Sequence, residues 1–101
     1  MYIHQHKWYN LDMITEKDKK TIQEISKKYS VKRVLLFGSS VDDAKESNDI
    51  DIAVEGISPK DFFRYYGELL FALSKPVDVV DLSGNSKFIN LIKQEGVLLY
   101  G

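Results

Sequence analysis

The segment from residue 49 to residue 54, Asp-Ile-Asp-Ile-Ala-Val, restricts the fold more than any other part of the chain, because its side chains alternate strictly. Successive residues of a strand point to opposite faces, so the segment predicts a strand with Asp49, Asp51 and Ala53 on one face. The other face carries Ile50, Ile52 and Val54. A strand of this kind fits a sheet that is covered by helices on one side and open on the other.

Helical and strand patterns alternate along the rest of the chain. Runs of strand length occupy residues 31–37 and 77–81, and the chain closes on an apolar segment at residues 97–100. Amphipathic helices are predicted at residues 15–29, at residues 58–73 and in a last segment that Gly96 ends. This order predicts an α/β (α+β) fold, a two-layer sandwich in which a small mixed sheet carries its helices on one face.

Capping residues set the predicted helix starts. Thr15 with Asp18 resembles a capping box in which aspartate replaces the usual Glu or Gln. Ser58 and Pro59 form a serine N-cap followed by proline at the first helical position. The last helix has two candidate N-caps, Ser83 and Asn85. The predicted apolar stripe of the second helix is Phe62, Tyr66, Leu69, Leu70 and Leu73, and that of the last helix is Phe88, Leu91 and Ile92.

With 101 residues and no cysteine, the chain has the size of one domain and has neither disulfides nor a thiolate metal site. We expect an aromatic-rich N-terminal arm over residues 1–14 and a folded domain over residues 15–101. Within the arm, His4 and His6 make at most a weak metal site, because two histidines are few ligands for one ion.

The charge pattern limits the partners. Fourteen basic and fifteen acidic side chains give a formal net charge of −1, and the lysines are interleaved with acids. Proteins that track a nucleic acid backbone carry a basic stripe, so long DNA or RNA is a poor candidate, whereas a single nucleotide remains open. No stretch approaches the ~20 apolar residues of a membrane span, and the N-terminus lacks the apolar core of a secretory signal. A cytoplasmic location is the default expectation.

Asp49 and Asp51 have a spacing that suits a metal site. At i and i+2 of one strand their Cα atoms lie about 6.6 Å apart, so both carboxylates can converge on one ion or on a metal pair. Oxygen ligands of this type suit Mg²⁺. Acids on an exposed strand face also serve solubility alone, so the pair is ambiguous by itself.

Gly38 and Ser39 follow the strand predicted at residues 31–37. Glycine lets the backbone turn sharply and approach a ligand, and the N–H groups of a following helical turn can hold an anion such as phosphate. A plain strand-to-helix turn with serine as N-cap explains the same dipeptide.

Combined, these features resemble the signature of the DNA polymerase beta-like nucleotidyltransferase superfamily. Phe37-Gly38-Ser39 ends one strand, nine residues follow, and Asp49-Ile-Asp51-Ile begins the next. The resemblance runs from about Lys17 to Tyr100 and is greatest to the minimal nucleotidyltransferases that are encoded beside HEPN-domain proteins. It implies that the two strands are antiparallel, that the Gly-Ser turn holds triphosphate oxygens, and that the aspartates hold two Mg²⁺ ions.

The family's third carboxylate lies on a neighbouring strand, and residues 77–81 offer Asp78 and Asp81. Their odd spacing puts them on opposite faces. If the valines at 77 and 79 are buried, Asp78 shares the open face with Asp49 and Asp51. Asp78 is therefore the predicted third group, which the resemblance assigns as general base or as part of the second metal site. The predicted nucleotide-binding residues are Gly38, Ser39, Ser40 and Lys45.

The resemblance implies transfer of a nucleoside monophosphate, AMP from ATP in the first instance, to a hydroxyl of a HEPN-type partner in a toxin–antitoxin pair. The loop after Gly38-Ser39 departs from the family because it lacks arginine and carries Asp42 and Asp43. An alternative is therefore a non-catalytic antitoxin that neutralises its partner by binding. A sugar-nucleotide glycosyltransferase ranks last, because those catalytic domains are far longer. Homo- and hetero-oligomers are both open, and the apolar end of the chain fits either a partner interface or packing on the sheet edge.

Overall fold

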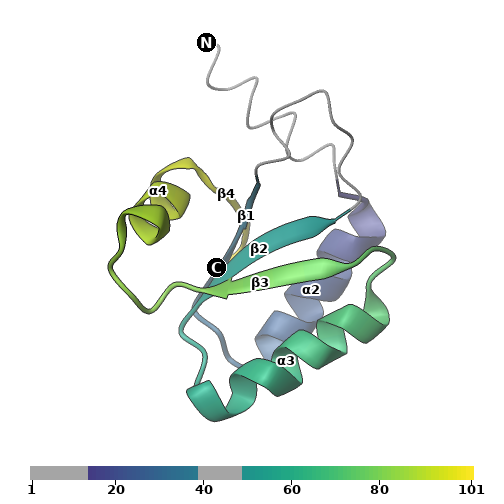
Figure 1. Ribbon diagram of the computed structural model, residues 1–101. Coiled ribbons are helices and arrows are strands. Elements are labelled where there is room, and N and C mark those ends of the chain that lie inside the picture. Colours follow the sequence, from purple (N-terminus) through teal and green to yellow (C-terminus); the bar gives the residue numbers. More distant parts are fainter. Residues whose placement is uncertain (1–13, 39–48) are drawn as a thin grey trace.

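The computed structural model of the protein describes residues 14–38 and 49–101 (Figure 1). Its elements in chain order are α2 (Glu16–Lys28), β1 (Arg33–Phe37), β2 (Ile50–Glu55), α3 (Pro59–Ala72), β3 (Val77–Asp81), α4 (Lys87–Glu95) and β4 (Val97–Tyr100). The predicted alternation of helices and strands is confirmed. Within these two stretches, no helix has the length and apolar content that crossing a membrane requires.

The strands of the described residues form one four-stranded sheet in the order β3-β2-β1-β4. β1 pairs antiparallel with both β2 and β4, whereas β2 and β3 run parallel. A parallel pair needs a crossover connection, and α3 supplies it between β2 and β3. The sheet is therefore mixed, as predicted, and the β1-β2 pair is antiparallel, as the resemblance implied.

α2 and α3 cover one face of the sheet, and α4 lies against the other (Figure 1). The larger core packs under α2 and α3 and includes the predicted set Ile50, Ile52 and Val54. A smaller cluster on the opposite face joins Ile92 of α4 to Leu35, Ala53 and Leu82. The expectation of one fully open face therefore needs a correction. At Ala53 the open-face series of β2 carries a small apolar side chain, and this is where α4 packs.

The start of α2 is joined to the end of α3. Thr15 caps α2, since its hydroxyl accepts a hydrogen bond from the Asp18 backbone N–H at 3.0 Å. The Asp18 carboxylate differs from the predicted capping box because it turns to Ser74. It is buried, and it accepts hydrogen bonds from the Ser74 backbone N–H at 3.2 Å and the Ser74 hydroxyl at 2.5 Å. Ser74 offers two donors to one carboxylate, which accounts for the difference.

α3 begins as predicted, with Ser58 at the N-cap and Pro59 in the first turn. Its buried stripe differs from the prediction at two positions, because Tyr65 is fully buried whereas Leu70 is 52% exposed. The Tyr65 hydroxyl lies 2.8 Å from the buried hydroxyl of Ser26 in α2. This hydrogen bond satisfies the polar end of the ring, so the tyrosine can be buried in the core.

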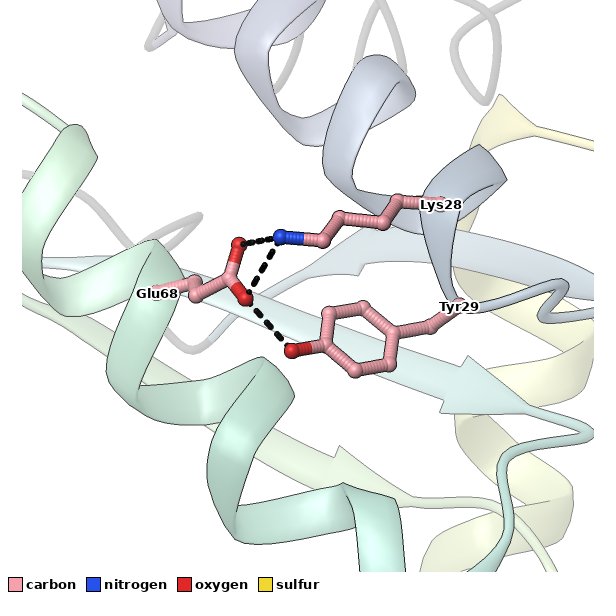
Figure 2. Close-up of polar contacts among 3 residues, drawn as sticks. All are labelled: Lys28, Tyr29 and Glu68. Carbon is pink, nitrogen blue, oxygen red and sulfur yellow. Dashed lines mark hydrogen bonds and ion pairs between the residues drawn. The ribbon is translucent and has the colours of Figure 1, made fainter.

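A polar cluster also joins α2 to α3 (Figure 2). Both carboxylate oxygens of Glu68 accept hydrogen bonds from the Lys28 ammonium at 3.0 Å, and one accepts another from the Tyr29 hydroxyl at 2.5 Å. The bond from Tyr29 lowers the pKa of Glu68, and the same bond raises the pKa of Tyr29. The Tyr29 ring stands edge-on to the buried ring of Tyr65, with centroids 5.7 Å apart. The helix pair under the sheet is thus fixed by both polar and aromatic contacts.

The predicted N-caps of the last helix are wrong. α4 is capped by Ser86, whose hydroxyl accepts a hydrogen bond from the Ile89 backbone N–H at 3.1 Å. The Ser83 backbone N–H is bound instead by the Asp81 carboxylate at 2.9 Å, which closes a turn at the end of β3. Gly96 ends α4, as predicted.

The apolar end of the chain packs on the sheet edge. β4 pairs with β1, and Leu99 is buried in the larger core. The Gln23 side chain of α2 donates a hydrogen bond to the Leu99 carbonyl at 2.9 Å. Leu98 is 52% exposed. Of the two explanations for this segment, packing on the sheet edge accounts for its burial.

Candidate active site

Asp51 and Asp78 are neighbours across the parallel pair of strands. They are register partners in β2 and β3, and Phe37 of β1 is the partner of Asp51 on its other side. Ile52 and Val79, which follow the two acids, are buried in the core under α2 and α3. Because side chains alternate along a strand, both carboxylates lie on the opposite face, the one that carries α4.

β3 has the orientation that was predicted from burial of its valines. Val77 and Val79 are buried, whereas Asp78 is exposed. Asp81 lies three residues further on and hence on the other face, where its carboxylate accepts the Ser83 N–H. Of the two acids on this strand, Asp78 is the one placed beside Asp51.

Asp51 is a partly buried acid among other acids. Its pKa is raised to about 6, first by burial and then by the negative charges of Asp78 and Asp49. Asp49 is exposed and directly precedes β2. Every contribution to this shift is upward, so the local field disfavours the charged carboxylate and would favour a bound cation.

The donor chemistry of this face suits a hard divalent cation. Carboxylate oxygens are the ligands that Mg²⁺ prefers, and a cation would relieve the crowding of like charges around Asp51. Over residues 14–38 and 49–101, no three His, Cys, Asp or Glu side chains converge as a metal-binding group. The fit therefore rests on the charge and chemistry of Asp49, Asp51 and Asp78.

Tyr66 of α3 reaches this site from the neighbouring layer. Its hydroxyl donates a hydrogen bond to the Asp78 carboxylate at 3.3 Å. Burial and then the charge of Asp78 raise the pKa of Tyr66, so the phenol stays protonated and keeps this donor. The sequence placed Tyr66 in an apolar stripe. Its hydroxyl was the available sign that the ring ends beside a polar group.

The carboxylates open onto a groove between the sheet and α4. It has a volume of about 630 Å³, and its walls include Gly38, Asp51, Asp78 and Tyr66. The α4 side is formed by Phe88, Leu91, Ile92 and Glu95. We call this space the α4 groove. Phe88 and Leu91 belong to the predicted apolar stripe of the last helix, but they are 53% and 54% exposed. Their exposure depends on the tertiary position of α4, which helical periodicity does not report.

Several predicted site residues lie outside the described part of the chain. Ser39, Ser40 and Lys45 of the predicted nucleotide-binding loop belong to residues 39–48, and His4 and His6 belong to residues 1–13. Gly38, the last described residue before that loop, follows β1 and lines the α4 groove.

The family model for polymerase beta nucleotidyltransferases matches residues 19–101. The chain therefore belongs to the polymerase beta-like nucleotidyltransferase family. A comparison with curated proteins gave no match.

Several solved structures with a similar fold come from toxin–antitoxin complexes. The MntA-HepT complex matches with 25% identity and a TM-score of 0.65, over 86% of this chain and 73% of the other. A toxin-antitoxin structure with AMP-PNP matches with 26% identity and a TM-score of 0.64, over 86% and 74%. A complex of a tri-AMPylated HEPN toxin with its MNT antitoxin from Shewanella oneidensis matches with 26% identity and a TM-score of 0.63, over 83% and 70%. The chain is thus similar to minimal nucleotidyltransferases that are paired with HEPN proteins.

Proposed function

We propose that this protein is an Mg²⁺-dependent nucleotidyltransferase that transfers AMP from ATP to a hydroxyl of a HEPN-type partner protein in a toxin–antitoxin pair. The observation that carries the proposal is the placement of Asp51 and Asp78 as register partners at the mouth of a groove that Gly38 also lines. The family match supports the reaction class. The AMPylated HEPN toxin and the AMP-PNP complex among the similar structures support the partner and the nucleotide.

The metal would be held by Asp51 and Asp78, with Asp49 beside them. When bound, Mg²⁺ supplies charge neutralisation for the phosphate oxygens of the substrate. Above pH 6 the Asp51 carboxylate is mostly ionised, since its pKa is about 6, and it can therefore act as an anionic ligand at neutral pH. Crowding among the acids disfavours the metal-free state and so increases the gain on binding a cation.

The reaction joins the acceptor oxygen to the α-phosphorus and breaks the bond from that phosphorus to the pyrophosphate leaving group. A base must accept the proton of the attacking hydroxyl. Asp78 is exposed at the mouth of the groove, where an incoming hydroxyl can reach it, and Tyr66 donates a hydrogen bond that holds its carboxylate in place. We assign proton acceptance to Asp78 and the positioning of that carboxylate to Tyr66.

A labelling experiment tests the proposal. The purified protein is mixed with Mg²⁺, α-phosphate-labelled ATP and a HEPN-domain protein from the same host, in parallel with lysate as a source of other acceptors. We expect a labelled HEPN band with the wild type, and a loss of about 100-fold or more with Asp51→Asn or Asp78→Asn. Asp81→Asn is the matched control, because it changes an acid of the same strand on the opposite face, and it should retain labelling.

Neutralisation of the HEPN protein separates transfer from binding. If Asp51→Asn neutralises its partner as well as the wild type does, and no protein is labelled in either reaction, the chain is a non-catalytic antitoxin. Labelling by Asp78→Asn together with its loss in Asp81→Asn would move the third carboxylate to Asp81.

A further inference from the structure

We infer that the α4 groove binds the adenine base of the nucleotide, with the triphosphate directed toward Gly38. This inference rests on the proposed function and deepens it, because it states where the base lies and why an adenine nucleotide is preferred over a uracil nucleotide. Three observations carry it: the position of the groove beside Asp51 and Asp78, the half-exposed apolar residues of α4, and the presence of Glu95 among the residues that line it.

The groove extends from the phosphate end of the site. Gly38, Asp51 and Asp78 line one side, and α4 lines the other. Its volume of about 630 Å³ falls in the range of pockets that bind small ligands, roughly 300–1,000 Å³. A nucleotide whose α-phosphate lies beside the carboxylates therefore has room to place its nucleoside against α4.

The α4 wall offers an exposed apolar surface. Phe88, Leu91, Ile92 and Glu95 follow the spacing of one helical stripe. Ile92 is buried and anchors the helix, whereas Phe88 and Leu91 keep about half of their surface exposed. The Phe88 ring stands edge-on to Phe37 of β1, with centroids 6.0 Å apart, and this contact stabilises its position. A base stacked on an aromatic side chain gains ~1–3 kcal/mol.

The charges along the groove orient the nucleotide. Among the described residues that line it, Asp51, Asp78 and Glu95 are acidic and none is basic. Phosphates are repelled by Glu95 on the α4 side, whereas a cation held by the aspartates would attract them at the other end. The uncharged base is the part of the nucleotide that an apolar wall accepts. The base therefore lies toward α4 and the triphosphate toward Gly38.

Glu95 also discriminates between bases. A carboxylate accepts hydrogen bonds and donates none at neutral pH. Adenine carries an amino group where uracil carries a carbonyl oxygen. An acceptor at Glu95 thus favours adenine over uracil.

Binding measurements test the inference without turnover. The ligand is α,β-methylene-ATP, whose α–β bridge resists transfer, and calorimetry in Mg²⁺ gives its Kd, with inorganic triphosphate as a second ligand. Phe88→Ser and Leu91→Ser should each raise the Kd for the nucleotide about tenfold and leave the Kd for triphosphate unchanged. Phe71→Ser is the matched control, because Phe71 is 93% exposed on α3 and lies outside the groove. Glu95→Gln should lower the preference for the adenine nucleotide over the uracil nucleotide.

The outcomes are separable. Equal nucleotide affinity in the wild type, Phe88→Ser and Leu91→Ser overturns the groove assignment and leaves the proposed function standing. An unchanged nucleotide Kd with a raised KM for the HEPN protein also overturns it, because the groove then holds the acceptor. Failure of the wild type to bind either ligand overturns both proposals. Circular dichroism checks the fold of each variant, and Phe88→Leu, which keeps apolar volume but removes the ring, replaces Phe88→Ser if that variant unfolds.

Discussion

At Asp51 the folding stability of the protein and the proposed binding of a metal ion make opposite demands on the charge of the side chain. Its pKa is raised from 3.8 to about 6 by burial and by two neighbouring acids. A group whose pKa is higher in the folded state contributes its stability below the unfolded pKa and loses it as pH rises through the folded pKa. The folded protein is therefore penalised by this carboxylate above about pH 6, the range in which the proposed metal ligand would carry its charge.

Asp51→Asn should stabilise the protein in the absence of divalent cations. Asparagine keeps the size of the side chain and removes the charge, so the gain at about pH 8 is on the order of 1–2 kcal/mol after allowance for solvent screening. At about pH 4 the difference should shrink, because the wild-type carboxyl is then mostly protonated. Urea unfolding in the presence of a chelator at both pH values measures it. Asp81→Asn should change little at either pH, and a variant no more stable than the wild type at pH 8 would contradict the electrostatic account.

At the scale of elements, α2 and α3 form a pair that is joined at several levels. Asp18 bonds to Ser74 at one end of the pair, Ser26 bonds to Tyr65 between the helices, and Glu68 binds the last turn of α2. Exposed ion pairs contribute little to stability. The buried contacts therefore contribute most of the stability of the helix pair. The contact of Asp18 is the most sensitive to substitution, because a buried carboxylate is costly without its hydrogen-bond donors.

Asp18→Ala should destabilise the protein by about 1–3 kcal/mol, because it removes a buried carboxylate that accepts two hydrogen bonds from the exposed Ser74. Glu16→Ala is the matched control. Glu16 is an exposed acid in the same first turn of α2, so it shares the favourable position at the helix N-terminus and lacks the buried partner. Its loss should cost at most ~1 kcal/mol. Chemical denaturation of both variants measures the difference, and equal losses would show that the interaction of Asp18 with the helix terminus outweighs its bonds to Ser74.

The elements also show what sequence patterns can and cannot predict. Alternation along a strand allows two orientations of its side chains. Burial of the valines of β3 selects one of them, and this is why the sequence predicts that Asp51 and Asp78 share a face. The predicted apolar stripe of α3 omits Tyr65. Its ring can be buried because its hydroxyl pairs with the hydroxyl of Ser26, which lies 39 residues away in the sequence. Phe88 and Leu91 look like core residues in the sequence. They form a wall of the groove because α4 packs beside the carboxylates in the folded protein, and a local sequence pattern does not predict that tertiary placement.

On the scale of the whole molecule, the sheet separates the parts that stabilise the fold from the parts that form the candidate site. The larger core lies on the α2–α3 face, and the carboxylates and the α4 groove lie on the other. The folded domain was predicted to begin at residue 15, and that boundary stays a prediction. Because the main core is on the far side of the sheet, substitutions at the site should alter charge and binding with little effect on packing.

Mg²⁺ should therefore reverse the order of stability between the wild type and Asp51→Asn. A cation that binds the folded state alone stabilises it by mass action, by about 1.4 kcal/mol at a tenfold excess over Kd, which is roughly 5–10 °C in Tm for a domain of this size. In a chelator Asp51→Asn should melt higher, and with increasing Mg²⁺ the wild type should gain and overtake it. Thermal melts followed by circular dichroism, with NaCl at matched ionic strength as the control, measure both curves. Parallel curves for the two proteins would mean that Mg²⁺ acts by screening, and Asp51 would then lose its assignment as a metal ligand.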